Sequence, residues 1–372
     1  MAPRITSIWQ ATSSRSWGGR ESVPAALHQV FLTRSVKSTL FCAEDSAIAN
    51  RYGNQPGICP LPFTGLHDRR TRRALAGLLR ADPPDVILCH FSHDLPLLRL
   101  VLGREKRTRL YLVKHVGPGR PKKGIIHRWI YRRVDAVLAV SEYIARRCRE
   151  TYPIDPARVC VWHPGVDTER FEFRPEERLR LRHDLGLQKS DILIGYVARL
   201  TPGKGHRELL EAFVSLAASI DNVYLALPGT ASVDEQPLAA ELRRCSDMVP
   251  TGKRVLWPGF IENVPGWLAA CDIFANPSPT EAFGLNTIEA MVVGRPVVGT
   301  TGGGTPEIIT PGQDGLLVEP NNPDHMGAAL RQLIEDADLR SRMGQAAQRT
   351  VRDRFALPVV VDRLLQLLGG QC

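Results

Sequence analysis

Short apolar runs alternate with amphipathic stretches along most of this chain, and that alternation limits its fold more than any other feature. In the first half, the runs 84–91, 109–113 and 134–140 are rich in Val, Ile and Leu but too short to be buried helices. Between them lie 69–80 and 124–133, where apolar and charged residues recur at helical spacing. Runs of this kind form parallel strands that helices cover on both faces. The pattern therefore predicts an α/β fold with a doubly wound parallel sheet.

The second half repeats the theme, which predicts a second sheet of the same kind. We expect strands at 191–198, 222–227, 254–257, 272–275 and 296–299, with helices at 207–219 and 285–293. The polar, charge-dense stretch 165–190 is typical of a connection between domains. A chain of 372 residues, 43% of them hydrophobic, is long enough for about two domains. Two such sheets predict a ligand site in a cleft at the carboxyl ends of their strands.

Charge is distributed unevenly along the chain, and the net +9 conceals this. Residues 1–170 contain 28 Lys and Arg against 14 Asp and Glu, whereas the remainder contains 20 against 25. We therefore expect an anionic partner to meet the first half. Nucleic acid is disfavoured, because neither an aromatic-interleaved single-strand groove nor a helix-turn-helix pattern occurs.

The segment 120–133 interleaves Arg and Lys with Ile, Trp and Tyr, and 69–73 adds further basic residues. A basic, aromatic-bearing helix can lie on an anionic membrane surface. It can also bind an anionic acceptor such as a phosphorylated lipid. The third alternative is structural, with Ile126, Trp129 and Ile130 in the core and the charges in solvent. The sequence leaves these alternatives open.

The cysteine pattern and the lack of long apolar segments predict a cytoplasmic protein. None of the eight cysteines forms a CxxC pair or a zinc-spaced Cys–His cluster, so we expect buried, reduced thiols. The N-terminal residues lack the apolar core of a signal peptide, and no run approaches the ~20 residues of a membrane-spanning helix. Peripheral attachment to the inner face of the cytoplasmic membrane would follow if the basic segment binds lipid.

The segment 272–318 has the densest chemical signal. After the expected strand, a loop presents Ser278 and Glu281, and Phe283-Gly284-Leu285 then opens a helix that contains Glu289. A helix N-terminus preceded by glycine is an anion site, because its first N–H groups are free and its dipole end is positive. Two carboxylates beside one phosphate site suit a nucleoside-diphosphate sugar. GxGxxG and the GxxxxGK[ST] loop are both absent, which argues against a dehydrogenase or a P-loop enzyme.

These residues resemble the EX7E signature of the family-4 retaining glycosyltransferases of the GT-B fold, with Glu281 and Glu289 as its two carboxylates. The similarity covers nearly the whole chain and is strongest from 195 to 320. Other segments match in the family's order: Ser16-Trp17-Gly18-Gly19, His163-Pro164-Gly165-Val166-Asp167 with Phe171, Val197-Ala198-Arg199-Leu200 with Gly203-Lys204-Gly205, Gly302-Gly303-Gly304 with Glu307, and Asp314-Gly315-Leu316-Leu317-Val318.

The resemblance implies a GT-B architecture, two Rossmann-like doubly wound domains facing a cleft. It implies an acceptor-side domain over 1–168, a nucleotide-sugar-binding domain over 169–355, and a segment 356–372 that packs back on the first domain. It also implies retaining transfer of a hexosyl group from a nucleotide-diphosphate sugar to an acceptor hydroxyl, with no metal and no other cofactor. The expected acceptor is a glycan or a lipid-linked molecule of bacterial lipopolysaccharide, polysaccharide or glycolipid synthesis.

The resemblance also assigns the site residues of the second domain. Arg199 and Lys204 would hold the donor diphosphate at the carboxyl end of a strand, where two cations stabilise the charge that develops on the leaving group. Glu289 would bind the ribose. Glu281, with the backbone of 282–285, would bind the transferred sugar. Substrate-binding positions in this domain are Ser278, Ala282, Phe283, Gly284, Leu285 and Glu289.

His115 is the catalytic residue that the resemblance assigns to the first domain. It follows the strand 109–113 and would contact a sugar hydroxyl or a backbone carbonyl, while a donor phosphate oxygen takes the acceptor proton. Gly18 and Gly19 would let the backbone approach the substrates closely. We expect His90, His93 and His163 to be structural or to lie on the acceptor side.

Two alternative functions remain open at this point. A nucleotide-sugar epimerase of the same fold would release a free sugar rather than a glycoside. A non-catalytic nucleotide-sugar-binding protein would not need Arg199, Lys204 and Glu281 intact.

Overall fold

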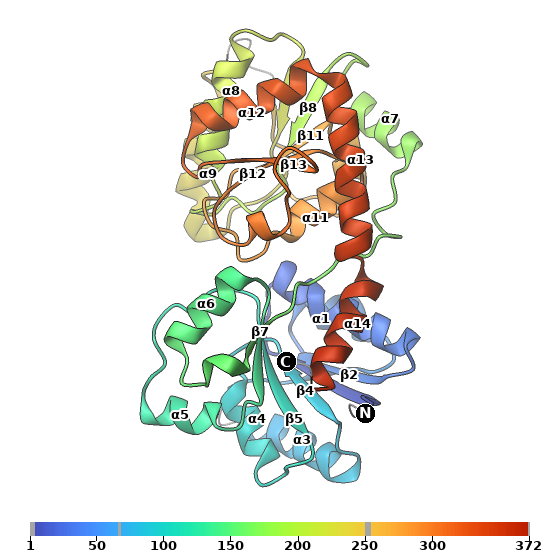
Figure 1. Ribbon diagram of the computed structural model, residues 1–372, viewed down its shortest axis with the longest axis vertical. Coiled ribbons are helices and arrows are strands. Elements are labelled where there is room, and N and C mark those ends of the chain that lie inside the picture. Colours follow the sequence, from blue (N-terminus) through green and yellow to red (C-terminus); the bar gives the residue numbers. More distant parts are fainter. Residues whose placement is uncertain (1–3, 66–67, 250–253, 371–372) are drawn as a thin grey trace. The chain divides into compact units, whose positions relative to one another are not determined.

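The computed structural model describes residues 4–65, 68–249 and 254–370, which form two compact units (Figure 1). Unit 1 comprises residues 1–165 together with 357–372, and unit 2 comprises 166–356. The expected domain boundaries, after 168 and after 355, differ from these by a few residues. Residues 371–372 of the expected terminal segment lie outside the described residues.

The described part of unit 1 contains a seven-stranded parallel sheet in the order β3-β2-β1-β4-β5-β6-β7. Its strand order reverses between β1 and β4, which makes that edge the switch point of a doubly wound fold. All residues of β4 and β6 are buried, as predicted for strands covered on both faces. The strands are β1 (Ser7–Thr12), β2 (Lys37–Ala43), β3 (Ile58–Leu61), β4 (Val86–Cys89), β5 (Arg109–Lys114), β6 (Ala136–Ala139) and β7 (Val159–Val161).

Helices α3 and α5 of unit 1 confirm the two amphipathic stretches predicted there. Helix α14, which follows unit 2 in the sequence, lies beside α1 (Figure 1). The indole of Trp162 donates to the carbonyl of Val360 at 2.9 Å, and this fixes α14 to the end of β7. The helices are α1 (Gly19–Thr33), α2 (Ala47–Tyr52), α3 (Arg69–Ala81), α4 (Leu95–Leu102), α5 (Ile125–Tyr131), α6 (Glu142–Thr151) and α14 (Leu357–Leu368).

Unit 2 has a six-stranded parallel sheet in its described part, in the order β10-β9-β8-β11-β12-β13. Its switch point lies between β8 and β11, and the five strands predicted from apolar runs are all present. The strands are β8 (Ile192–Gly195), β9 (Val223–Ala226), β10 (Val255–Leu256), β11 (Ile273–Asn276), β12 (Val297–Thr300) and β13 (Gly315–Val318).

The helices of unit 2 include α8 and α11, both as predicted. The stretch 165–190 was expected to be a connection between domains, and the structure corrects this expectation. Residues 166–190 belong to unit 2 and contain helix α7. Two of its charged side chains are paired, since Arg178 and Arg182 donate to the Asp272 carboxylate at 2.5 and 2.9 Å. The helices are α7 (Pro175–Asp184), α8 (His206–Ala217), α9 (Gln236–Ser246), α10 (Val264–Ala270), α11 (Leu285–Val292), α12 (Pro323–Glu335) and α13 (Ala337–Arg354).

Two further sequence expectations concern cysteines and membrane spans. Cys160 is disulfide-bonded, which corrects the expectation of reduced thiols at that position. Free thiols belong to Cys42, Cys59, Cys89, Cys148, Cys245 and Cys271, and Cys372 lies outside the described residues. Within the described ranges, every helix is too short or too polar to span a bilayer.

Candidate active site

The candidate site of unit 2 lies at the carboxyl ends of β8 and β11, where the strand order reverses. Strand β8 continues into Tyr196, and β11 ends at Asn276 shortly before Ser278. The Asn276 amide donates to the hydroxyl of Thr287 on α11 at 2.9 Å, which fixes the start of that helix against the strand end. Ligands of open α/β sheets bind at such a switch point.

Glu281 is the centre of a hydrogen-bond network at this edge. The ammonium of Lys204 and the hydroxyl of Ser278 both donate to Glu281 Oε1, at 2.7 and 2.8 Å. The Tyr196 hydroxyl lies 2.9 Å from Ser278 Oγ and donates to the Lys204 carbonyl. The structure thus brings together three predicted site residues and adds Tyr196, a buried aromatic that sequence reasoning did not single out. Within the described residues nothing donates to Glu281 Oε2, which leaves that oxygen to a ligand.

Two glycines bring the surrounding loops onto this network. Gly205 has φ +74°, and a Cβ there would lie 2.2 Å from the Pro277 carbonyl oxygen. Gly303 has φ +69°, and a Cβ there would lie 2.0 Å from the Glu281 carbonyl oxygen. That same carbonyl accepts a hydrogen bond from Gly304 N at 2.9 Å. Only glycine permits these two approaches, which hold Lys204 and Glu281 in register.

Helix α11 begins beside the network, with Gly284 as its N-cap in the left-handed region at φ 114°. The free N–H groups of its first turn and its positive dipole end suit a phosphate. The Asn286 amide donates to the Val197 carbonyl at 3.4 Å and so joins this turn to the loop after β8. Phe283 is 3% exposed, and its ring packs edge-on against Phe355. This predicted binding residue therefore presents its backbone, not its side chain.

The two remaining predicted residues of unit 2 lie outside the network. Glu289 is half-buried on α11. Burial raises the pKa of its carboxyl to about 7, although the positive charge of Arg170 lowers that pKa in part. Arg199 is exposed, and within the described residues no hydrogen bond or ion pair links it to Lys204 or Glu281. Arg199 is thus available to an incoming anion, whereas Lys204 is already paired with a carboxylate.

In unit 1, His115 is one end of a buried chain of hydrogen bonds. Its Nε2 lies 3.0 Å from Nδ1 of His90, and Nε2 of His90 lies 3.0 Å from Oε1 of Gln10. The Gln10 amide donates to the Pro24 carbonyl at 3.1 Å, which fixes its Oε1 as an acceptor. A neutral His90 must then donate to Gln10 and accept from His115. His115 therefore carries its proton on Nε2, and its Nδ1 is a free acceptor.

The electrostatics of this chain keep His115 neutral. Burial lowers the pKa of His115 well below its usual value, and the positive charges of Arg20 and Lys114 lower it further. Burial also lowers the pKa of His90 to about 3. A neutral imidazole can accept a hydrogen bond from a sugar hydroxyl, and the contact that the resemblance implies for His115 stays a prediction. His90, which we expected to be structural or acceptor-side, is its direct partner.

The glycine pair of unit 1 lies where α1 begins. Gly18 is extended, and a Cβ there would be 3.5 Å from Glu21 Oε2, so unit 1 itself does not require glycine at that position. Buried Glu21 accepts from Ser14 Oγ at 2.5 Å and from Arg20 Nε at 2.7 Å. Sequence reasoning missed this cluster, and its only signal was proximity to the glycines.

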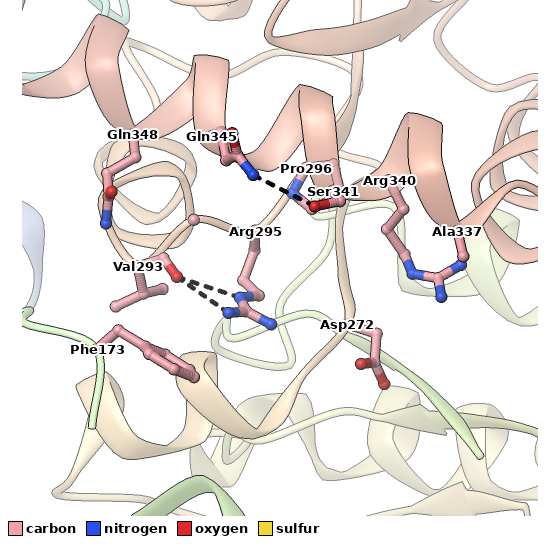
Figure 2. A pocket seen from close by; sticks show the side chains of 11 residues that line it. Phe173, Asp272, Val293, Arg295, Pro296, Ala337, Arg340, Ser341, Gln345 and Gln348 are labelled. Carbon is pink, nitrogen blue, oxygen red and sulfur yellow. Dashed lines mark hydrogen bonds between the residues drawn. The ribbon is translucent and has the colours of Figure 1, made fainter. Parts of the chain in front are cut away.

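Unit 2 also has a pocket of about 420 Å³ (Figure 2). It lies at the amino end of β12, whereas the candidate site lies at the carboxyl ends of the strands. The Arg295 guanidinium points at the Val293 carbonyl, to which it donates twice at 3.2 Å, and it packs over the Phe173 ring. Arg340 donates to the Leu333 carbonyl at 2.6 Å. Arg340 thereby joins α13 to α12, whereas Arg295 holds the loop between α11 and β12. None of the predicted site residues lines this pocket.

Metal-ligating residues do not gather in the part of the chain that the structure describes. There, no three His, Cys, Asp or Glu side chains lie close enough together to hold a metal ion. Asp336 and Asp338 form an Asp-x-Asp pair at the start of α13, where Asp336 caps the helix by accepting from Leu339 N at 2.7 Å.

Comparison with known proteins matches two family models to the two halves of the chain. The model "Glycosyltransferase Family 4" matches residues 17–170, and the model "Glycosyl transferases group 1" matches residues 177–350.

Curated relatives share about 30% identity with the chain. A GDP-mannose-dependent monoacylated alpha-(1-6)-phosphatidylinositol monomannoside mannosyltransferase of Corynebacterium glutamicum is 30% identical over 66% of this chain and 64% of the relative. A D-inositol 3-phosphate glycosyltransferase of Segniliparus rotundus is 29% identical over 78% of this chain and 62% of the relative. The chain thus spans less than two thirds of the length of these relatives.

Solved structures share the fold over nearly the whole chain. A glycosyltransferase from Rickettsia africae has a TM-score of 0.85 at 19% identity and covers 98% of both chains. Anabaena HepE in complex with UDP and glucose has a TM-score of 0.81 at 22% identity, covering 98% of this chain and 99% of that one. The fold, the two family models and the ordered motifs agree, and the chain belongs to the family-4 glycosyltransferases of the GT-B fold.

Proposed function

We propose that this protein transfers a hexosyl group from a nucleotide-diphosphate sugar to a hydroxyl of a glycan or lipid-linked acceptor. The observation that carries the proposal is the Lys204–Ser278–Glu281 network beside the first turn of α11, at the switch point of unit 2. The relatives named above include a GDP-mannose-dependent transferase, and HepE was solved with UDP and glucose, which supports a nucleotide-sugar donor.

We assign each part of the donor to one of these groups. The diphosphate lies at the N-terminus of α11, where Arg199 and Lys204 add two positive charges. Glu281 Oε2 accepts from hydroxyls of the transferred sugar. Glu289, a turn further along α11, accepts from the ribose hydroxyls. Lys204 exchanges part of its contact with Glu281 for the phosphate, so the charge on the leaving diphosphate is stabilised most as the glycosidic bond breaks.

The same arrangement supports transfer with retention of anomeric configuration and without a metal. Arg199, Lys204 and the α11 dipole supply the positive charge that a divalent cation supplies in other transferases. A donor phosphate oxygen takes the proton of the attacking hydroxyl. In unit 1, His115 accepts a hydrogen bond from a sugar hydroxyl through Nδ1 and orients it without taking its proton.

We infer the acceptor and the cellular location from the surface of helix α5 in unit 1. Exposed fractions on α5 are 86% at Ile125, 71% at Ile126 and 42% at Trp129, whereas Ile130 is buried. The structural alternative, with Ile126 and Trp129 in the core, is therefore wrong. An apolar face this exposed, set among Arg and Lys, suits an anionic bilayer surface. We place the protein on the inner face of the cytoplasmic membrane, acting on a cell-envelope glycolipid, lipopolysaccharide or polysaccharide acceptor.

A thermal-shift panel of UDP-, GDP- and ADP-sugars tests the proposed donor site. We expect one donor to stabilise the full chain, and Lys204→Met to weaken its binding by about tenfold or more, because a charge-assisted contact is lost. Lys189→Met is the matched control, since Lys189 is an exposed lysine of unit 2. That variant should bind as the wild type does.

The stabilising donor then serves for turnover in the presence of EDTA. We expect release of nucleoside diphosphate that depends on acceptor, and a product whose anomeric proton signal in NMR shows the configuration of the donor. Release of free sugar without acceptor would instead favour the epimerase. Binding by no donor, or equal binding by Lys204→Met and Lys189→Met, would refute the proposed site.

A further inference from the structure

The pocket of Figure 2, at the amino end of β12, gathers charged and polar side chains that the proposed chemistry does not use. Its volume of about 420 Å³ lies within the range of sites for small ligands. Two arginines, one carboxylate and the Phe173 ring line it, together with the polar side chains Ser341, Gln345 and Gln348. All of these residues belong to unit 2.

One face of α13 packs against the loop that carries Arg295. Gly344 lies in the middle of this face, where a Cβ would be 2.3 Å from the Gly294 carbonyl oxygen. Arg340 and Gln348 are one turn before and one turn after Gly344, on the same face of the helix. The Gln348 amide donates to a carbonyl of the last turn of α11 at 2.9 Å. Arg340 on α13 and Arg295 on the loop therefore line one pocket, as Figure 2 shows.

The Arg295 guanidinium keeps some N–H groups for a ligand. Its Nε and Nη2 donate to the Val293 carbonyl and its Nη1 to the Cys271 carbonyl, which uses three of its five N–H groups. Among the described residues, no carboxylate pairs with this guanidinium. One of its faces packs on the Phe173 ring, 5.1 Å from the ring centre. Arg295 is thus held in place by carbonyls and a ring, and its charge has no counterion.

Arg340 leaves a complete edge of its guanidinium unused. Its Nη1 donates to the Leu333 and Ile334 carbonyls at 2.6 and 3.1 Å, at the end of α12. Its Nε and Nη2 have no partner in the part of the chain that the structure describes. These two nitrogens form one side of a planar group and can donate to two oxygens of one anion. The carbonyl contacts fix this half-buried side chain, so the free edge is ordered before a ligand arrives.

Positive charge predominates around this pocket. Asp272 is the one carboxylate among the described residues that line it. Its two oxygens accept from Arg178 and Arg182 at 2.5 and 2.9 Å, so two further arginines already balance its charge. Arg295 and Arg340 are therefore a local surplus of positive charge. A concave site with a surplus of one sign attracts ions of the opposite sign.

We propose that Arg295 and Arg340 bind a phosphate group in this pocket, either inorganic phosphate or the phosphate of a small ester. A phosphate has enough oxygens for the free N–H groups of both side chains, and guanidinium groups bind it through pairs of hydrogen bonds. The side-chain oxygens of Gln345 and Gln348 accept from hydroxyl groups of an ester. This site goes beyond the proposed function and does not depend on it, because the donor diphosphate is assigned to the carboxyl ends of the strands.

Titration of the full chain with inorganic phosphate and with glycerol 3-phosphate, followed by 31P NMR without donor or turnover, tests this site. We expect Arg340→Met to weaken binding of both phosphates by about tenfold or more, because a charge-assisted pair of hydrogen bonds is lost. Arg342→Met is the matched control, since Arg342 is an exposed arginine of the same helix that does not line the pocket. That variant should bind as the wild type does.

Lys204→Met separates this pocket from the proposed donor site, where a phosphate can also bind. We expect Lys204→Met to keep the binding that depends on Arg340. Loss of that binding in Lys204→Met, equal binding by the wild type, Arg340→Met and Arg342→Met, or no binding by the wild type would overturn the proposal.

Stability and ligand source complete the design. An arginine that only joins α13 to α12 would lower the melting temperature of Arg340→Met and leave its phosphate affinity unchanged, which would also overturn the proposal. Arg340→Lys keeps the charge but not the planar edge, so its affinity should lie between those of the wild type and Arg340→Met; it carries the test if Arg340→Met does not fold. Tighter binding of glycerol 3-phosphate than of phosphate identifies an ester as the ligand, and equal affinities identify phosphate itself.

Discussion

Lys204 and Glu281 show how single residues prepare the donor site of this protein. The Lys204 side chain is 31% exposed and that of Glu281 is 11% exposed, and Lys204 Nζ lies 2.7 Å from Glu281 Oε1. An ion pair of this kind orders both side chains before substrate arrives. Because only Oε1 of Glu281 is used, the pair can bind a diphosphate on one side and a sugar hydroxyl on the other.

The histidine chain of unit 1 makes the stability of the protein depend on pH. The pKa of His90 is lowered from about 6.5 when unfolded to about 3 when folded. The unfolded state therefore binds more protons between these values, and stability falls as the pH falls below 6.5. Between these two pKa values, one such histidine lowers the free energy of unfolding by roughly 1 kcal/mol for each pH unit of acidification.

We predict that His90→Gln reduces this loss. Urea unfolding of both proteins at pH 7, 6, 5 and 4, followed by tryptophan fluorescence, measures the difference. The variant should be less stable than the wild type at pH 7, because it breaks the chain to His115, but the gap should narrow as the pH falls. Other groups with shifted pKa values, such as His206 and Glu289, are present in both proteins and cancel. If the difference in unfolding free energy between the wild type and His90→Gln stays constant with pH, His90 is not a buried neutral histidine.

At the scale of elements, helix α5 has apolar side chains that packing within unit 1 does not cover. It is seven residues long, and Ile130 and Tyr131 are its buried residues. Its exposed isoleucines and Trp129 would be unfavourable in water unless another surface covers them. The ring of Trp129 also lies under the Arg99 guanidinium at 4.9 Å, which adds a positive charge to this face.

We predict that the full chain binds vesicles that contain phosphatidylglycerol and that salt weakens this binding. Cosedimentation should fall when ionic strength rises from about 0.05 to 0.5 M, because surface charges are screened. The double variant Ile125→Ser, Ile126→Ser should bind less at every salt concentration. Leu179→Ser is the control, since Leu179 is 69% exposed in unit 2.

Donor binding offers the internal comparison for that experiment. Its few cations act at short range in a partly buried site, so the thermal shift produced by the donor should change less with salt. Salt sensitivity of equal size for donor and vesicles, or wild-type vesicle binding by the double variant, would contradict a lipid-facing α5.

Most inner strands were predictable from apolar runs, but β1 and β2 of the unit 1 sheet were not, whereas β10, at an edge of the unit 2 sheet, was. Strand β4 is buried throughout and gave a clear apolar run. Strands β3 and β7, at the two edges of the unit 1 sheet, are short and partly exposed, and β3 contains Pro60. An edge strand has a neighbouring strand on one side only, and the residues of β3 and β7 are less buried, so their apolar pattern is weaker.

The candidate site was predictable where a motif lies in one segment. Ser278, Glu281 and Glu289 fall within a dozen residues, and their order is informative by itself. Gln10 and His90 are 80 residues apart, and nothing in either segment indicates that they pair. Buried polar contacts of this kind depend on the register of β1 against β4, which only the folded chain provides.

At the scale of the whole molecule, each unit carries its polar cluster at the switch point of its own sheet. In unit 1 the cluster follows β1, β4 and β5, and in unit 2 it follows β8 and β11. Parallel strands all end at the same edge, so residues distant in sequence meet there. This rule of the fold explains why the Lys204–Glu281 network of unit 2 and the histidine chain of unit 1 each lie at the carboxyl edge of a sheet.

Hydrogen–deuterium exchange of the full chain with and without the stabilising nucleotide-sugar tests the central claim most directly. We predict that the donor slows exchange in 196–205, 276–286 and 301–304, which surround Lys204 and Glu281, and that the amide hydrogens of the first turn of α11 change most. Protection confined to residues 1–165, or none at saturating donor, would contradict a donor site at the switch point of unit 2.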